Sequence, residues 1–201
     1  MFYMGVDLGQ KKDHTAIAVA ERWDGGRAFL APTMKCLEVR YLERVRLGTR
    51  YTVVAERVRQ MVQSEKLAGR IAVAVDATGV GAPVVDLLRA ARLGCQVMAV
   101  SITGGERESQ TGSGWNVPKR DLIGGVQVLL ERGELKISRK LQDSWTLVKE
   151  LLDVRMTLSG AGKVRLGADG SGEHDDLAIA LAVACRRAQR KTNGHGPGRL
   201  V

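Results

Sequence analysis

Cysteine is scarce in this sequence, and long apolar runs do not occur in it. The three cysteines, Cys36, Cys95 and Cys185, lie far apart without any C-x-x-C spacing. This usage argues against a disulfide framework or a zinc site and favours reduced thiols in a cytoplasmic protein. No segment reaches the roughly 18 continuous apolar residues of a membrane span, and the N-terminus lacks the basic region and cleavage site of a signal peptide. We therefore expect a cytoplasmic protein that does not use a membrane as a partner.

A P-loop is also missing from the sequence. The nearest stretch, Gly160-Ala161-Gly162-Lys163, lacks the earlier glycine of G-x-x-x-x-G-K-[ST] and continues into Val164. We interpret it as the turn of a hairpin. The sequence therefore shows no ATPase motor of the P-loop type.

Apolar and basic residues, in contrast, are abundant. The 201 residues are 44% hydrophobic, which is enough for one domain with its own core. We place this domain at residues 1–190, followed by a disordered basic tail at residues 191–201, where glycine and proline are dense. Lys and Arg number 31 against 22 acids, for a formal charge of +9. This excess indicates a polyanionic partner, and nucleic acid is favoured over an acidic membrane surface.

Two short apolar runs each end on an aspartate. Residues 2–9 are typical of a buried strand that carries Asp7 at its end, and the continuous apolar run 71–75 is followed by Asp76. In a parallel arrangement, both carboxylates lie at the same edge of the sheet. In the first half of the chain, the other patterns predict strands at 15–23 and 35–46, a helix from a Thr52 cap to about Ala68, a helix at 82–92 and a strand at 95–102. A polar and mobile loop at 103–114 follows. The second half is predicted to contain a helix at 117–132, an extended piece at 135–137, a helix capped by Ser138 that runs through Leu152, a hairpin at 154–158 and 163–166, and a helix from Asp175.

A third acidic position opens this last helix. The sequence Glu173-His174-Asp175-Asp176 precedes a run so rich in alanine and leucine that the helix must pack closely on the sheet. One aspartate would serve as a helix cap, but two adjacent ones exceed what one cap needs. A cluster of Asp7, Asp76, Asp175 and Asp176 is unfavourable unless cations compensate it. Mg²⁺ or Mn²⁺ would do so, because both ions prefer carboxylate and water oxygens.

Two such ions, roughly 3.5 to 4 Å apart, activate a water and stabilise the leaving oxygen during attack on a phosphodiester. The basic surface would hold a nucleic acid by its phosphates, and Lys11, Lys12, Lys119 and Arg120 stand in loops and a helix start near the proposed site. Trp115 would stack on a base.

Three further side chains are accessory candidates at this site. His14 and His174 would ligate metal or position water, although a histidine beside a turn is more often a surface residue or a cap partner. Glu173 stands just before the acidic pair.

The order of these elements resembles the RNase H-like superfamily of metal-dependent nucleases, and the residues are most similar to the nuclease domain of phage large terminase subunits. The resemblance implies an α/β RNase H-like fold, with a mixed central sheet and helices on both faces. It also implies that Asp7, Asp76 and either Asp176 or Asp175 ligate two ions. A similarity to RuvC-type resolvases in the last helix favours Asp176, with Glu173 as an outer member. The matching stretches are Gly5–Gly9 with Asp13–Ile17, Val75–Gly81, Val117–Leu122 and Glu173–Ala182.

The implied function is a two-metal endonuclease that cleaves double-stranded DNA, as in phage DNA packaging, in the cytoplasm of a bacterial host that carries the phage or prophage. A packaging ATPase or portal would be a separate partner, whether the chain is an excised domain or a stand-alone relative. Three alternatives stay open: a RuvC-like resolvase, a catalytically silent DNA-binding module, and an ATP-binding protein of the actin or sugar-kinase type. The last is suggested by Asp7-Leu8-Gly9 followed by Thr15, but 201 residues leave no room for its second domain.

Overall fold

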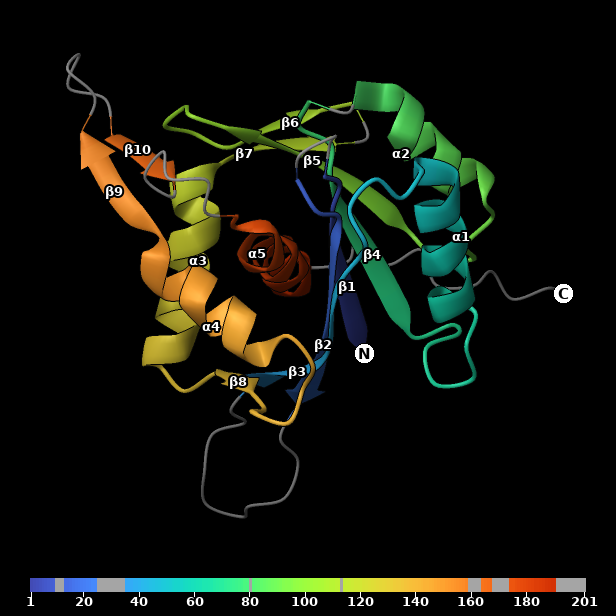
Figure 1. Ribbon diagram of the computed structural model, residues 1–201, viewed down its shortest axis with the longest axis horizontal. Helices are drawn as coiled ribbons and strands as arrows, with labels where there is room; N and C mark the ends of the chain where they lie inside the picture. The colour runs from blue at the N-terminus through green and yellow to red at the C-terminus, as the bar shows by residue number, and fades with distance from the viewer. Residues whose placement is uncertain are drawn as a thin grey trace, which may run out of the picture.

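The computed structural model describes residues 1–9, 13–24, 35–79, 81–112, 114–158, 164–167 and 174–190 (Figure 1). Within these ranges, no helix has both the length and the apolar content needed to cross a bilayer. The expected tail at residues 191–201 lies outside the described residues. The elements in chain order are β1 (Phe2–Asp7), β2 (Ala16–Asp24), β3 (Lys35–Arg44), α1 (Tyr51–Val62), β4 (Ile71–Asp76), α2 (Gly81–Ala90), β5 (Val97–Thr103), β6 (Ser109–Thr111), β7 (Gly114–Pro118), α3 (Lys119–Glu131), β8 (Leu135–Ile137), α4 (Ser144–Asp153), β9 (Arg155–Leu158), β10 (Val164–Gly167) and α5 (Asp176–Gln189).

A mixed sheet of eight strands forms the centre of the molecule, in the order β6-β7-β5-β4-β1-β2-β3-β8, and β9 and β10 form a separate two-stranded sheet. Strands β1, β2 and β3 pair antiparallel as a meander. Strand β4 joins β1 in parallel, and β5 and β7 extend the parallel half. The crossover through α1 is what allows β1 and β4 to run in the same direction, so that both strands end at one edge.

Helices cover both faces of this sheet. Figure 1 shows α3, α4 and α5 on one side of β1 and β4, and α1 and α2 on the other. Each face has its own apolar core: Leu177 and Leu181 of α5 belong to one cluster, and Val54 and Val58 of α1 to the other. The mixed α/β architecture with two helical layers is the one that the sequence predicts.

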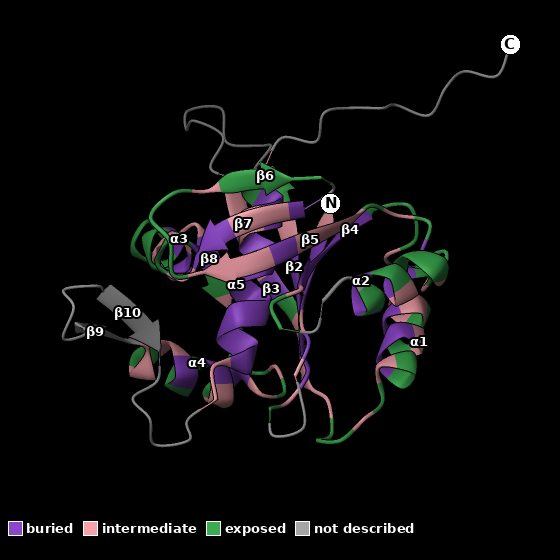
Figure 2. Cartoon of the chain, turned by 90° about the horizontal axis from the view of Figure 1, so that it is seen from above, coloured by how far each residue is buried: buried purple, intermediate pink, exposed green. Residues whose placement is uncertain are grey.

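Helix α5 is the most deeply buried helix in Figure 2 and lies directly against the sheet. Its alanines allow a very close approach to β1: a Cβ added to Gly5 would lie 1.8 Å from the carbonyl oxygen of Ala180. No side chain fits there, so glycine in β1 and small residues in α5 are both required. The close packing expected from the alanine-rich sequence is confirmed, and it fixes the start of α5 against the ends of β1 and β4.

Two predicted helix caps, Thr52 and Ser138, do not lie at the N-cap position of a helix. The N-cap position of α1 is Arg50, so Thr52 lies inside the helix and does not cap it. Helix α4 begins at Ser144, later than the predicted cap at Ser138, because Asp143 before it adopts left-handed backbone with φ +60°. Cap residues are frequent in turns as well, so a serine or threonine alone does not locate a helix start.

The polar stretch 103–114 is only partly a loop, which corrects the sequence prediction. It contains β6, which pairs antiparallel with β7 at the edge of the sheet. The three residues of β6 are exposed and polar, so hydrophobic alternation gave no sign of a strand. Trp115, just after this stretch, lies in β7, and the mobility of residues 104–108 stays a prediction.

Candidate active site

Asp7 and Asp76 occupy equivalent positions at the ends of neighbouring parallel strands. The register of β1 and β4 pairs Asp7 directly with Asp76. Asp76 is 8% exposed, and its Oδ1 accepts a hydrogen bond of 2.8 Å from the Thr78 amide. Among the described residues, none donates a hydrogen bond to Asp7 or forms an ion pair with it. The strands thus hold two carboxylates side by side and leave Asp7 without a hydrogen-bond donor or ion-pair partner among the described residues.

The first turn of α5 adds two more carboxylates. Asp175 is the N-cap residue and Asp176 the first helical residue, but neither side chain caps the helix. Asp175 Oδ2 instead accepts a hydrogen bond of 2.5 Å from Lys119 Nζ. Asp176, 5% exposed, lies 3.0 Å from Arg44 Nη2 through its Oδ2. Helix capping, which the sequence left open for one aspartate of this pair, is therefore excluded.

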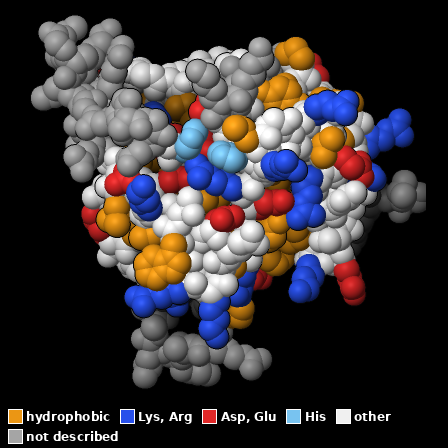
Figure 3. All heavy atoms as spheres, viewed as in Figure 1, with side chains coloured by type: hydrophobic (Ala, Val, Ile, Leu, Met, Phe, Trp, Pro, Cys, Tyr) orange, Lys and Arg blue, Asp and Glu red, His pale blue; other side chains and the backbone are white. Residues whose placement is uncertain are grey.

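All four aspartates line one cavity of about 470 Å³ at this edge of the sheet, together with Lys119. His174 also lines it, 3.5 Å from Asp13 and 3.9 Å from Asp176. The two histidine rings, His14 and His174, meet edge to face with centroids 5.7 Å apart, and in Figure 3 the described histidines lie side by side on the surface.

Mutual repulsion and burial raise the pKa of Asp7 well above its ordinary value. Burial is the largest cause, followed by the charges of Asp76, Asp176 and Asp175, while Lys119 lowers the pKa. Burial likewise raises the pKa of Asp76, against the lowering effect of the Thr78 hydrogen bonds. The pKa of Asp176 is raised by burial and lowered by Arg44. The fully ionised cluster is thus unfavourable without additional positive charge.

The oxygen-only donor set of these acids fits Mg²⁺ or Mn²⁺ in kind, and the uncompensated Asp7 calls for a cation. Within the described ranges, however, no three or more His, Cys, Asp or Glu side chains form a group that could hold a metal as it stands. Lys119 and Arg44 engage the two α5 aspartates instead. An ion that uses either α5 aspartate would therefore have to displace the protein cation from it.

Glu150 of α4 is a buried acid that the sequence analysis did not single out. It is 5% exposed, and its Oε2 accepts a hydrogen bond of 2.9 Å from the Ala178 amide. Glu150 thereby supplies from another helix the cap that Asp175 does not provide. Burial raises the pKa of Glu150 to about 7, opposed by hydrogen bonds from the amides of Ala178 and Leu177 and by the charge of Arg44.

None of the remaining predicted site residues that the structure describes lines this cavity. Arg120 donates to the Glu106 carbonyl oxygen at 2.7 Å and does not line the cavity. The guanidinium of Arg190 lies 3.3 Å from the ring centroid of Trp115, so one face of that ring is covered. His14 Nδ1 lies 3.0 Å from the Val45 carbonyl oxygen. Lys11, Lys12 and Glu173 lie outside the described residues.

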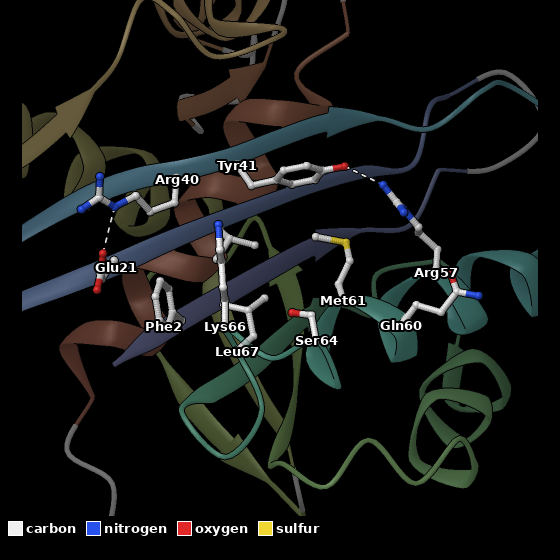
Figure 4. A pocket seen from close by; sticks show the side chains of 11 residues that line it. Phe2, Glu21, Arg40, Tyr41, Arg57, Gln60, Met61, Ser64, Lys66 and Leu67 are labelled. Carbon is white, nitrogen blue, oxygen red and sulfur yellow. Dashed lines mark hydrogen bonds and ion pairs between the residues drawn. The ribbon is translucent and has the colours of Figure 1, made fainter.

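A second hollow, of about 650 Å³, lies between α1 and the open face of β2 and β3 (Figure 4). Its floor is apolar, with Phe2 and Leu67 among its residues. The two arginines at its rim are already paired, Arg40 with Glu21 at 2.9 Å and Arg57 with the Tyr41 hydroxyl at 2.8 Å. The cluster of acids expected from the sequence therefore lines the aspartate cavity and not this hollow.

The fold is similar to solved nuclease domains of large terminases. The domain from thermophilic phage G20c, with bound magnesium, is 22% identical with a TM-score of 0.67, and the alignment covers 93% of this chain and 81% of that chain. The domain from Thermus phage P74-26 is 19% identical with a TM-score of 0.59, over 92% of this chain and 77% of that chain. The g2p domain from bacteriophage SPP1, with bound Mn, is 14% identical with a TM-score of 0.56, over 93% and 86%.

No protein-family model and no curated protein sequence matches the chain. At such low identity, the structural likeness establishes the fold and not the activity. The chain has the fold of large terminase nuclease domains, which confirms the RNase H-like α/β architecture expected from the sequence.

Proposed function

We propose that this chain is a metal-dependent endonuclease that cleaves the phosphodiester bonds of double-stranded DNA by a two-metal mechanism, as in phage DNA packaging. The observation that carries the proposal is the pairing of Asp7 with Asp76 in the strand register, opposite the aspartates that open α5. Three separate stretches of chain build one acidic cavity. A protein gains no stability from such crowding, so a bound cation is its simplest purpose.

The residues of the chain divide into two roles in this proposal. Asp7 and Asp76 would ligate from the sheet and Asp176 from α5, with Asp175 beside it. The divalent ions, when bound, activate a water and stabilise the leaving oxygen. Lys119, which lies among these acids, would contact the phosphate once Asp175 has another partner. His174, at the mouth of the cavity with Asp13, would orient water.

The substrate and the partners are also part of the proposal. A formal charge of +9 favours a polyanion, and contacts by charge would give little sequence preference. Arg120, Trp115, Lys11 and Lys12 stay candidates for contacts to DNA. Terminase nuclease domains of similar fold suggest a packaging ATPase or portal as the partner.

Plasmid cleavage tests this proposal. We expect the wild-type chain to nick and linearise plasmid DNA with Mn²⁺ and to lose this activity in EDTA. Asp7→Asn, Asp76→Asn and Asp176→Asn should each lower cleavage by at least about a hundredfold, because each removes a ligand charge. Asp86→Asn is the matched control, since Asp86 is exposed on α2 and pairs with Arg89.

The outcome also separates the alternatives. Cleavage confined to branched DNA would indicate a resolvase, and ATP binding without cleavage would indicate a kinase-like protein. DNA binding alone would indicate a silent module. Wild-type cleavage by all three aspartate variants would refute the assignment of the site.

A further inference from the structure

Arg44, the last residue of β3, lies between two buried acids. Its Nη2 is 3.0 Å from Asp176 Oδ2 and 3.5 Å from Glu150 Oε1. The first contact is a hydrogen bond, whereas the second is an ion pair without one. The backbone at this point is held by the residue that precedes α4, because the Arg44 amide donates to Asp143 Oδ2 at 3.3 Å. The Arg44 guanidinium therefore donates a hydrogen bond to Asp176, and a second acceptor, Glu150 Oε1, lies close by.

Glu150 is fixed in a way that keeps this second acceptor available. Its Oε2 is held by the Ala178 amide in the first turn of α5. Its Oε1 is buried and accepts no hydrogen bond, and Arg44 Nε is likewise buried without a partner. Buried polar atoms without partners are costly, so this arrangement leaves Arg44 incompletely satisfied where it lies. A small shift toward Glu150 would satisfy Oε1 and would release Asp176 Oδ2 toward the cavity.

We infer that Arg44 is an exchangeable internal counter-ion of the acidic cavity. It neutralises Asp176 while no divalent ion is bound, and it moves its hydrogen bond to Glu150 Oε1 when an ion takes Asp176. Arg44 and Glu150 are thus positioning residues: neither touches the ion, and both set how readily Asp176 becomes a ligand. The inference rests on the proposed metal-binding role of Asp176 and adds to it the device that controls access to that carboxylate.

Electrostatic attraction lowers the free-energy cost of such an exchange. A divalent ion at Asp176 would repel the guanidinium at short range, and the attraction of the nearby Glu150 carboxylate would offset that repulsion. Without Glu150, the displaced guanidinium of Arg44 would have no second acid beside it, since the described acids paired with this guanidinium are Asp176 and Glu150.

Calorimetric titration of Mn²⁺ into the DNA-free protein, at mildly alkaline pH, tests the inference. Arg44→Gln should tighten Mn²⁺ binding about tenfold, because the competing cation is gone. Glu150→Gln keeps the carbonyl acceptor for the Ala178 amide but should weaken binding about tenfold, because Arg44 is then left to Asp176 alone. A purely structural role for this pair would instead weaken binding in both variants.

A double variant separates exchange from a general electrostatic field. With Arg44→Gln already present, Glu150→Gln should change Mn²⁺ affinity by less than about twofold, since Glu150 acts through Arg44. Additive effects of the two substitutions would overturn the inference. Arg44→Lys keeps the charge and should stay within about threefold of wild type, which preserves a test if Arg44→Gln fails to fold.

Arg57→Gln is the matched control. Arg57 of α1 pairs with Glu43, the neighbour of Arg44 in β3, and Arg57 does not line the aspartate cavity. Its Mn²⁺ affinity should equal that of wild type. If wild type binds Mn²⁺ and Arg44→Gln binds it equally or more weakly, the counter-ion role is refuted. The proposed nuclease function is not affected by that result. Absence of Mn²⁺ binding by the wild-type protein defeats both.

Discussion

Glu150 should make the stability of this protein fall as pH rises, and one substitution should remove the effect. Burial raises its pKa in the folded chain from 4.5 to about 7. Below about pH 4.5 the carboxyl group is protonated in both states and contributes nothing. Between about pH 4.5 and 7 the unfolded chain releases this proton first, so the folded state loses stability as pH rises. Above the folded pKa the loss is complete.

The size of the loss follows from the two pKa values. The gap between 4.5 and about 7, at about 1.4 kcal/mol per pKa unit, corresponds to about 3 kcal/mol. Glu150 is 5% exposed, so solvent does little to screen it. Against a total stability of about 5 to 15 kcal/mol for a typical domain, this is a substantial fraction.

Urea unfolding in EDTA, at about pH 4.5 and about pH 8, measures the effect. The free energy of unfolding of wild type should fall relative to that of Glu150→Gln by about 3 kcal/mol between the two pH values. Taking the difference between the two proteins removes the contribution of the titratable groups that do not interact with Glu150. Glu65→Gln, at an exposed glutamate after α1, is the control and should track wild type. A wild-type minus Glu150→Gln difference that stays constant with pH would refute the reasoning.

Three further predictions concern the sheet and α5. Asp7→Asn should raise the metal-free stability at neutral pH, because it removes a buried acid that neighbouring aspartates repel, and should abolish Mn²⁺ binding; a stability loss in urea unfolding would contradict this. Gly5→Ala should cost about 3 kcal/mol or prevent folding, since its Cβ would meet the Ala180 carbonyl oxygen at 1.8 Å; a thermal midpoint equal to wild type would show that the contact is relaxed. Leu181→Ala, at a side chain that is fully buried, should cost about 3 kcal/mol in urea unfolding, and a loss below about 1 kcal/mol would mean that the core there is loose.

The sequence predicted the strands that carry Asp7 and Asp76 because both are continuous apolar runs that end on an acid. Their pairing required only that the two strands be parallel neighbours, as the register shows. The start of α5 could also be predicted from the sequence, because its alanine-rich run follows the acidic pair directly. These features depend on local pattern and on a general rule of sheet topology.

Arg44 and Glu150 were missed because their roles depend on long-range packing. Arg44 follows Glu43 at the end of a strand with alternating charges, which is typical of an exposed edge. In α4, apolar Trp145 is 70% exposed, whereas acidic Glu150 is buried, the reverse of the usual amphipathic pattern. One signal was present: Glu150 stands three residues after Leu147, on the buried side of the helix. Strand β6 was missed because an exposed polar strand has no hydrophobic period.

A crystal structure of the protein soaked in Mn²⁺ tests the central claim most directly. The account predicts anomalous density for manganese within bonding distance of Asp7, Asp76 and an aspartate of α5, with the Arg44 guanidinium shifted from Asp176 to Glu150. Manganese bound elsewhere, or a cavity in which Arg44 and Lys119 keep both α5 aspartates at saturating Mn²⁺, would contradict it.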